Sequence, residues 1–156
     1  MIAINIPGLG DINLNAAIID YNGTLALDGK LMKGLEEPLN ALSEFLEIHI
    51  VTGDGFGTAR SELANINCKL TIIPAEEQGL SKQKYLHQLD PETTVSIGNG
   101  KNDQHILKES ALGIAIVGPE GIAVEAILSA DIILPSISLA LELFHNPKRL
   151  KATLRE

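Results

Sequence analysis

Short runs of aliphatic residues alternate with longer segments of helical periodicity, and this alternation constrains the fold more than any other feature of the chain. The aliphatic runs lie at residues 16–20, 48–52, 70–73, 94–98, 113–117 and 131–134. The helical patterns lie at residues 33–46, 58–65, 81–89, 102–110, 120–129 and 138–154. Continuous aliphatic runs are typical of parallel strands, because such strands are buried on both faces. The alternation therefore predicts an α/β fold with a doubly wound, Rossmann-like parallel sheet in a three-layer α/β/α sandwich.

The length and the turn residues predict one domain that carries two small hairpins. The 156 residues contain no repeat, linker or low-complexity tract, so we expect residues 1–156 to form a single domain. Aromatic residues make up only 3% of the chain, so the core must be mostly aliphatic. A turn at residues 7–10 predicts an N-terminal hairpin over about residues 1–15. A turn at Asp28-Gly29 predicts a flap hairpin over about residues 25–32.

The charge and the apolar pattern exclude several classes of partner. The formal net charge is −8, which repels polyanions at long range, so we expect no nucleic-acid partner. No apolar run reaches the roughly 18–20 residues that cross a bilayer, and no segment resembles a secretory signal. We therefore expect a cytoplasmic protein without a membrane partner. Cys68, the single cysteine, is expected to be a small buried residue, and His49 a structural histidine within an aliphatic run.

Polar residues follow three of the aliphatic runs, at residues 20–24, 52–55 and 98–103. In doubly wound sheets, ligands bind outside the carboxyl ends of the strands. Glycines in such loops allow the backbone to approach a ligand, and free N–H groups favour phosphate. Phosphoryl transfer requires a nucleophile, fixed donors for the phosphate oxygens and a cation that screens the charge. The residues that could supply these parts are, in chain order, Asp20, Thr52, Lys82 and Asp103.

The order of these residues along the chain resembles the order of the conserved motif residues in the haloacid-dehalogenase-like superfamily. The four motifs of the superfamily are matched by residues 20–25, by residues 48–52, by Lys82 (with Lys84 as the alternative) and by residues 98–103. Within the superfamily, residues 52–59 are similar to the catalytic domain of P-type ATPases. Residues 146–155 are similar to the small proteins called soluble P-type ATPases. The resemblance extends over nearly the whole chain.

The resemblance implies a magnesium-dependent phosphohydrolase that acts on phosphoester or phosphoanhydride bonds of a small phosphorylated substrate. Asp20 would attack phosphorus and become an aspartyl phosphate. The implied catalytic residues are Asp20, Asn22, Thr52 and Lys82. The implied phosphate-binding residues are Gly23, Thr52, Gly53 and Lys82. Mg²⁺, the implied cofactor, would be held by Asp20, Asn22 (through its backbone carbonyl), Asn99 and Asp103.

Two asparagines depart from the pattern of the superfamily. Asn22 stands where phosphatases of the superfamily have an Asp that acts as general acid and base. Because Asn carries no such proton, we expect the step to be slower by about 10²–10⁴-fold. Asn99 stands where the superfamily has a magnesium-binding Asp, so we expect weak magnesium binding without substrate. The alternative hypothesis is a catalytically silent domain that keeps the phosphate site for binding or regulation.

The spacing of the motifs leaves no room for a cap domain. A hairpin and a helix fill the segment between Asp20 and Thr52, where ATP-driven pumps insert a nucleotide-binding domain. The segment between Gly53 and Ser81 is likewise filled by a helix, a strand and a loop. Capless members of the superfamily often close their sites by oligomerising, so we expect a homo-oligomer. The sequence does not identify the substrate.

Overall fold

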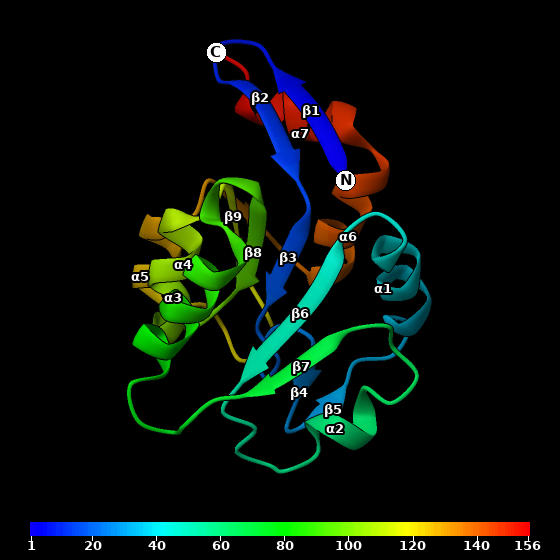
Figure 1. Cartoon of the computed structure of the whole chain (residues 1–156), viewed down its shortest axis with the longest axis vertical. Coiled ribbons are helices and arrows are strands. Elements are labelled where there is room, and N and C mark those ends of the chain that lie inside the picture. The colour runs from blue at the N-terminus through cyan, green and yellow to red at the C-terminus, as the bar shows by residue number, and fades with distance from the viewer.

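Six aliphatic segments pair into one parallel sheet, which is the centre of the computed structural model of residues 1–156 (Figure 1). The strands are β3 (Ala16–Ile19), β6 (Glu47–Thr52), β7 (Lys69–Ile72), β8 (Thr94–Gly98), β9 (Leu112–Ile116) and β10 (Ile132–Leu134). Their order is β10-β9-β8-β3-β6-β7, and every neighbouring pair is parallel. The chain therefore moves outward from β3 in both directions, which places a switch in strand order beside β3. The predicted fold class is confirmed.

Helices cover both faces of the sheet, so the molecule has three layers (Figure 1). One face carries α1 (Glu36–Ser43) and α6 (Ile137–His145), and the other carries α3 (Gln78–Leu89), α4 (Gln104–Glu109) and α5 (Val124–Ser129). Alternate residues of β3 point to opposite layers: Ala17 and Ile19 belong to the cluster with α1 and α6, and Ile18 to the cluster with α3 and α4. Burial on both faces explains why the strands are continuous aliphatic runs.

The predicted helix over residues 138–154 is wrong, because two helices occupy this segment. α6 ends at His145, and α7 (Pro147–Leu154) follows a break at Asn146, whose φ is −128° and ψ is 65°. Proline disfavours helical geometry in the residue before it, so Asn146 leaves the helix and Pro147 begins a new one.

Other helix boundaries also differ from the predicted ones. The helix predicted over 58–65 is the single turn α2 (Ala59–Glu62), and the one predicted over 33–46 is confined to α1. The helix predicted over 102–110 begins as a 3-10 turn, Lys101–Asp103, and α3 begins three residues before the predicted start. The helix predicted over 120–129 starts only at Val124, because the preceding residues form a tight turn.

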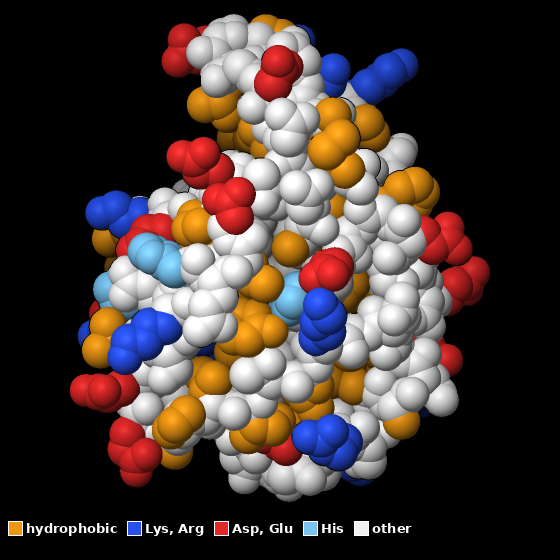
Figure 2. All heavy atoms as spheres, viewed as in Figure 1, with side chains coloured by type: hydrophobic (Ala, Val, Ile, Leu, Met, Phe, Trp, Pro, Cys, Tyr) orange, Lys and Arg blue, Asp and Glu red, His pale blue; other side chains and the backbone are white.

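Two antiparallel hairpins lie outside the main sheet. β1 (Ile2–Ile6) pairs with β2 (Gly10–Leu14), and with α7 they form a projection at one end of the molecule (Figure 1, Figure 2). β4 (Ala26–Leu27) pairs with β5 (Lys30–Leu31) as a small flap directly after β3. No cap domain is present within residues 1–156, and no helix is both long enough and apolar enough to span a membrane.

Two side chains outside the candidate site were expected to be structural. His49 is buried, and its ring nitrogens lie 2.8 Å from the hydroxyl oxygen of Tyr85 and 3.1 Å from Oε2 of Glu47. Burial lowers the pKa of His49, so the ring is neutral at physiological pH. The prediction of a structural histidine is consistent with these contacts. Cys68 is only half-buried, at the edge of the core, rather than fully buried as predicted.

Candidate functional site

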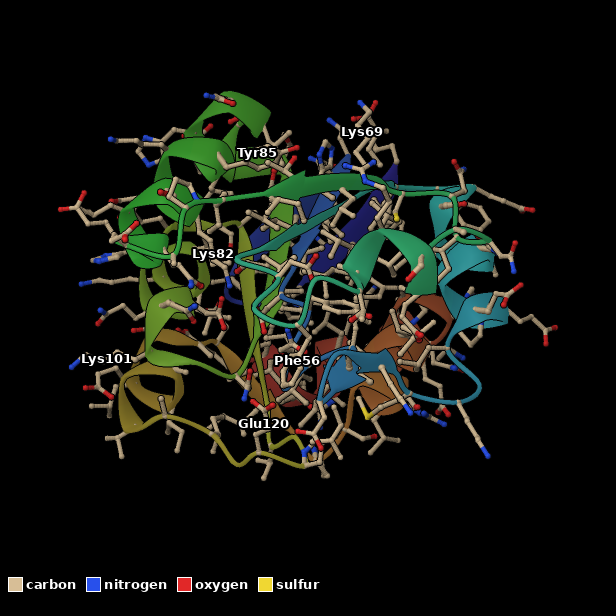
Figure 3. All side chains as sticks on the ribbon, turned by 90° about the horizontal axis from the view of Figure 1, so that it is seen from below. Phe56, Lys69, Lys82, Tyr85, Lys101 and Glu120 are labelled. Atoms are coloured by element: carbon tan, nitrogen blue, oxygen red, sulfur yellow. The ribbon has the colours of Figure 1, made fainter.

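The loops that follow β3, β6 and β8 meet at a polar cavity of about 280 Å³. Figure 3 looks onto this edge of the sheet. No hydrophobic side chain lines the cavity. Its lining residues are Asp20, Asn22, Thr52, Gly53, Asp54, Gly55, Gln78, Asn99, Gly100, Asn102 and Glu120. The cavity thus includes five of the eight residues to which the resemblance gives a role, and the other three, Lys82, Asp103 and Gly23, lie against them.

A buried lysine joins two of the carboxylates at this site. Lys82 Nζ donates to Asp20 Oδ1 and to Asp103 Oδ1, at 2.6 Å in each case. Lys82 is 1% exposed and Asp103 is fully buried. Lys84, the alternative, points to solvent two residues further along α3. The structure therefore brings Lys82, and not Lys84, to Asp20.

The burial of this charged group shifts its pKa values. Burial, followed by the nearby charge of Asp103, raises the pKa of Asp20 from 3.8 to about 6, and Lys82 offsets only part of this effect. Burial by itself would lower the pKa of Lys82, but the charges of Asp103 and Asp20 outweigh it and raise that pKa. Lys82 therefore remains protonated, and one positive charge faces two carboxylates without water between them.

The loop after β6 prepares a hydroxyl donor. Thr52 Oγ1 accepts a hydrogen bond from the backbone N–H of Asp54 at 3.0 Å, so the hydroxyl proton of Thr52 is free to donate into the cavity. Asp54 has a φ of 46°, and its Oδ1 accepts from the N–H groups of Thr58 and Ala59 at the start of α2. At Gly53 a Cβ would lie 2.6 Å from the amide nitrogen of Gln78, so a larger residue there would have to displace the Gln78 side chain.

The two asparagines hold neighbouring loops in place. Asn22 Oδ1 accepts from the N–H of Gly29 at 3.0 Å, which ties the loop after β3 (here called the nucleophile loop, after the role that the resemblance implies for Asp20) to the flap hairpin. Asn99 Nδ2 donates to the carbonyl of Gly121 at 3.1 Å, and Asn99 Oδ1 accepts from the hydroxyl of Thr24 at 3.3 Å. Both amides therefore have structural partners in addition to the catalytic or metal-binding positions that the resemblance implies.

Gly23 is the point of closest approach between the loops. Its φ is +86°, a conformation that favours glycine. A Cβ at this position would lie 2.5 Å from Asn99 Nδ2 and 2.7 Å from Oε2 of Glu120. Any larger residue would therefore be strained at this φ and would have to displace the side chains of Asn99 and Glu120.

The motif analysis missed two residues of the cavity wall, Gln78 and Glu120, and it gave no role to a third, Asn102, which lies within the motif at residues 98–103. Gln78 Oε1 accepts from Asn102 Nδ2 at 2.9 Å, which joins the start of α3 to the loop after β8. Glu120 follows the aliphatic strand β9, so a search for polar residues after every aliphatic run would have found it. Gln78 is the first residue of α3 and carries no comparable signal in the sequence.

The oxygen atoms in the cavity fit a hard divalent cation. Asp20 offers a carboxylate, and Asn22 and Asn99 offer amide or carbonyl oxygens, which are the ligands that Mg²⁺ prefers. Asp103 does not line the cavity: Oδ1 accepts from Lys82 and Oδ2 from the N–H groups of Asn99 and Gly100. No three His, Cys, Asp or Glu side chains converge on one point. The residues therefore suit a cation that keeps water and substrate phosphate among its ligands.

Sequence comparison relates the chain to two kinds of protein, although no family model matches it. An uncharacterized protein of Methanocaldococcus jannaschii is 43% identical over 81 residues, which cover 49% of this chain and 87% of that protein. A probable copper-transporting ATPase of Arabidopsis thaliana is 31% identical over 130 residues, which cover 82% of this chain. The chain spans only 12% of the length of that ATPase, so the match concerns one region of a much longer protein.

Solved structures share the fold at low sequence identity. A 3-deoxy-D-manno-octulosonate 8-phosphate phosphatase from Moraxella catarrhalis, in complex with magnesium, phosphate and KDO, has a TM-score of 0.70 and 16% identity. That match covers 92% of this chain and 95% of the phosphatase. A sugar phosphatase of haloacid-dehalogenase subclass IIB has a TM-score of 0.60 and 15% identity, over 87% of this chain and 98% of that one.

Proposed function

We propose that the chain is a magnesium-dependent phosphohydrolase of the haloacid-dehalogenase-like superfamily, which works through an aspartyl phosphate on Asp20. One observation carries the proposal: Lys82 is buried between Asp20 and Asp103, at 2.6 Å from each, at the base of a polar cavity. Burial of two carboxylates and a lysine costs folding free energy, so a purely structural domain has no reason to keep them. A site that binds and transfers phosphate needs such groups.

In this proposal the free oxygen of Asp20, Oδ2, attacks phosphorus while Lys82 holds Oδ1. The P–O bond to the leaving group breaks, and the phosphoryl group is transferred to Asp20. The protonated Lys82 and the hydroxyl of Thr52 donate to the phosphoryl oxygens, and Gly23 and Gly53 allow the backbone to approach them. Mg²⁺, when bound, screens the charge that Asp20 and the phosphate share. Water then attacks the aspartyl phosphate and releases phosphate.

Turnover is expected to be slow. The leaving group and the attacking water both need a proton carrier, and Asn22 has none. Its Oδ1 moreover accepts from the N–H of Gly29, so the side-chain amide holds the flap hairpin. The leaving group must then take its proton from solvent and the attacking water must release its proton to solvent, at a loss of about 10²–10⁴-fold in the step concerned.

A second candidate function is a silent phosphate-binding or regulatory domain. It is favoured by the structural use of both asparagine amides, since Asn99 anchors the turn after β9 and Asn22 anchors the flap. In that case phosphate would bind, but Asp20 would not become phosphorylated.

The test is phosphate release from a panel of phosphoesters, with and without Mg²⁺, by the wild type and by Asp20→Ala. Release that requires both Mg²⁺ and Asp20 supports the phosphohydrolase. Asp11→Ala is the matched control, because Asp11 is exposed in the N-terminal hairpin. Release equal to that of Asp20→Ala would contradict the proposal and favour the silent domain.

Three further expectations remain proposals. The substrate is a small phosphorylated molecule, the protein forms a homo-oligomer, and it is cytoplasmic. Light scattering at several concentrations tests the second of these, because a monomeric mass at every concentration would contradict it.

A further inference from the structure

A tight turn after β9 places Glu120 at the cavity. The turn is closed by the N–H of Gly121, which donates to the carbonyl of Gly118 at 2.9 Å. Gly118 packs directly on the nucleophile loop, since a Cβ there would lie 2.0 Å from the carbonyl oxygen of Gly23. Asn99 holds the other side of the turn through its bond to Gly121. Two loops of the site, those after β3 and β8, therefore hold the backbone of this turn, while Glu120 itself is an exposed residue.

The Glu120 carboxylate has no positive partner. It makes no ion pair, and its Oε2 lies 2.7 Å from the point where a Cβ of Gly23 would be. Lys101, on the neighbouring loop, pairs with Glu125 at 2.9 Å. Figure 3 shows Lys101 at the periphery of this edge, apart from Glu120.

The cavity wall as a whole is short of positive charge. Three carboxylates line it, from Asp20, Asp54 and Glu120, but no Lys or Arg does. Lys82 is already shared by Asp20 and Asp103. A bound divalent cation would compensate Asp20 and the substrate phosphate. Asp54 keeps two backbone N–H donors from the start of α2, so Glu120 is the least compensated of the three.

Two further residues of the wall, Asn102 and Gln78, are neutral amides. Asn102 and Gln78 bond to each other through one donor and one acceptor, which leaves Asn102 Oδ1 free to accept from a ligand. A neutral amide wall suits hydroxyl groups, and a cavity of about 280 Å³ suits a small leaving group. The net charge of −8 adds to the repulsion of anions.

We propose that Glu120 is a specificity-determining residue, which restricts the site to phosphate monoesters whose leaving group is hydroxylated and carries no further negative charge. This inference rests on the proposed function for its relevance to turnover. The carboxylate acts at short range, within the Debye length of about 8 Å at physiological ionic strength, so salt screens it only in part. Nucleoside triphosphates and phosphorylated carboxylic acids are therefore poor ligands, whereas polyol phosphates are good ones.

The test compares two ligands of nearly equal size, glycerol 3-phosphate and 3-phosphoglycerate, which differ by one carboxylate. Their dissociation constants are measured by calorimetry with Mg²⁺, and inorganic phosphate is assayed in the cell afterwards, so that any hydrolysis during the titration is detected. We expect the wild type to prefer glycerol 3-phosphate by about tenfold, which corresponds to about 1.4 kcal/mol. Glu120→Gln should remove most of that preference, and Glu120→Lys should reverse it.

Glu76→Gln is the matched control, because it makes the same charge change at an exposed residue that does not line the cavity. It should leave the preference unchanged. Equal affinities for both ligands in the wild type, or a preference that Glu120→Gln leaves intact, would overturn the inference even if phosphate release depends on Asp20. The expected preference without any Asp20-dependent release would instead support the inference and contradict the phosphohydrolase. Failure of both ligands to bind would overturn the inference, whereas the phosphohydrolase is decided by the Asp20 comparison alone.

Discussion

The raised pKa of Asp20 has a measurable consequence for stability: Asp20→Asn should stabilise the metal-free protein at neutral pH. The pKa of Asp20 is raised from 3.8 to about 6, first by burial and then by the charge of Asp103. Between these two values the folded protein keeps a proton that the unfolded chain releases, so the stability falls as the pH rises through this range. Below 3.8 both states are protonated and the penalty vanishes.

The size of the effect follows from the shift. Each unit of pKa difference corresponds to about 1.4 kcal/mol, so ionised Asp20 costs the folded protein about 3 kcal/mol at pH 7. Asn removes this cost but gives Lys82 a neutral acceptor in place of a carboxylate, which costs about 1 kcal/mol. The expected net gain is about 2 kcal/mol, or roughly 4–8 °C in Tm for a domain of this size.

The assay is urea unfolding of the wild type and of Asp20→Asn in EDTA, followed by circular dichroism between pH 4.5 and pH 7. The difference should grow with pH across this range and level off near pH 7. Asp11→Asn, an exposed control, should change the free energy of unfolding by less than about 0.5 kcal/mol at any pH. An Asp20→Asn variant less stable than the wild type at pH 7, or a difference independent of pH, would refute the reasoning.

Three other changes give clear expectations. Lys82→Met leaves two buried carboxylates without a cation and should cost about 3–5 kcal/mol in urea unfolding, whereas Lys101→Met breaks an exposed pair and should cost at most about 1 kcal/mol; similar losses would contradict this. Asn22→Asp restores a proton carrier and should raise Mg²⁺-dependent phosphate release by about 10²–10⁴-fold; an unchanged rate would show that protonation does not limit turnover. Gly113→Ala would place a Cβ 2.0 Å from a carbonyl oxygen of α4 and should cost about 3 kcal/mol or prevent folding. The control Gly79→Ala, where the Cβ has ordinary contacts, should be neutral or stabilising in thermal unfolding.

Local sequence patterns predicted the architecture because a strand that is buried on both faces must be a continuous run of apolar residues. Ala17, Ile18 and Ile19 are fully buried against different layers, so each had to be apolar, and the run could be recognised without a structure. The same patterns put the polar loops at one edge of the sheet, because all six strands are parallel. Helix ends were less predictable. A proline near a helix end can either follow the last helix or begin another one. Only the structure shows that Pro147 begins a new helix, α7.

The sequence by itself determined the fold class and the residues that gather at the carboxyl ends of the strands. Only the tertiary structure decided what each of them contacts. Lys82 reaches Asp20 from 62 residues away, and Asn99 accepts from Thr24 across 75 residues. Glu120 approaches Gly23 only because a turn after β9 packs on the nucleophile loop. Periodicity records the burial of a residue along its own strand or helix, whereas the distance between two side chains on different loops depends on how the loops pack.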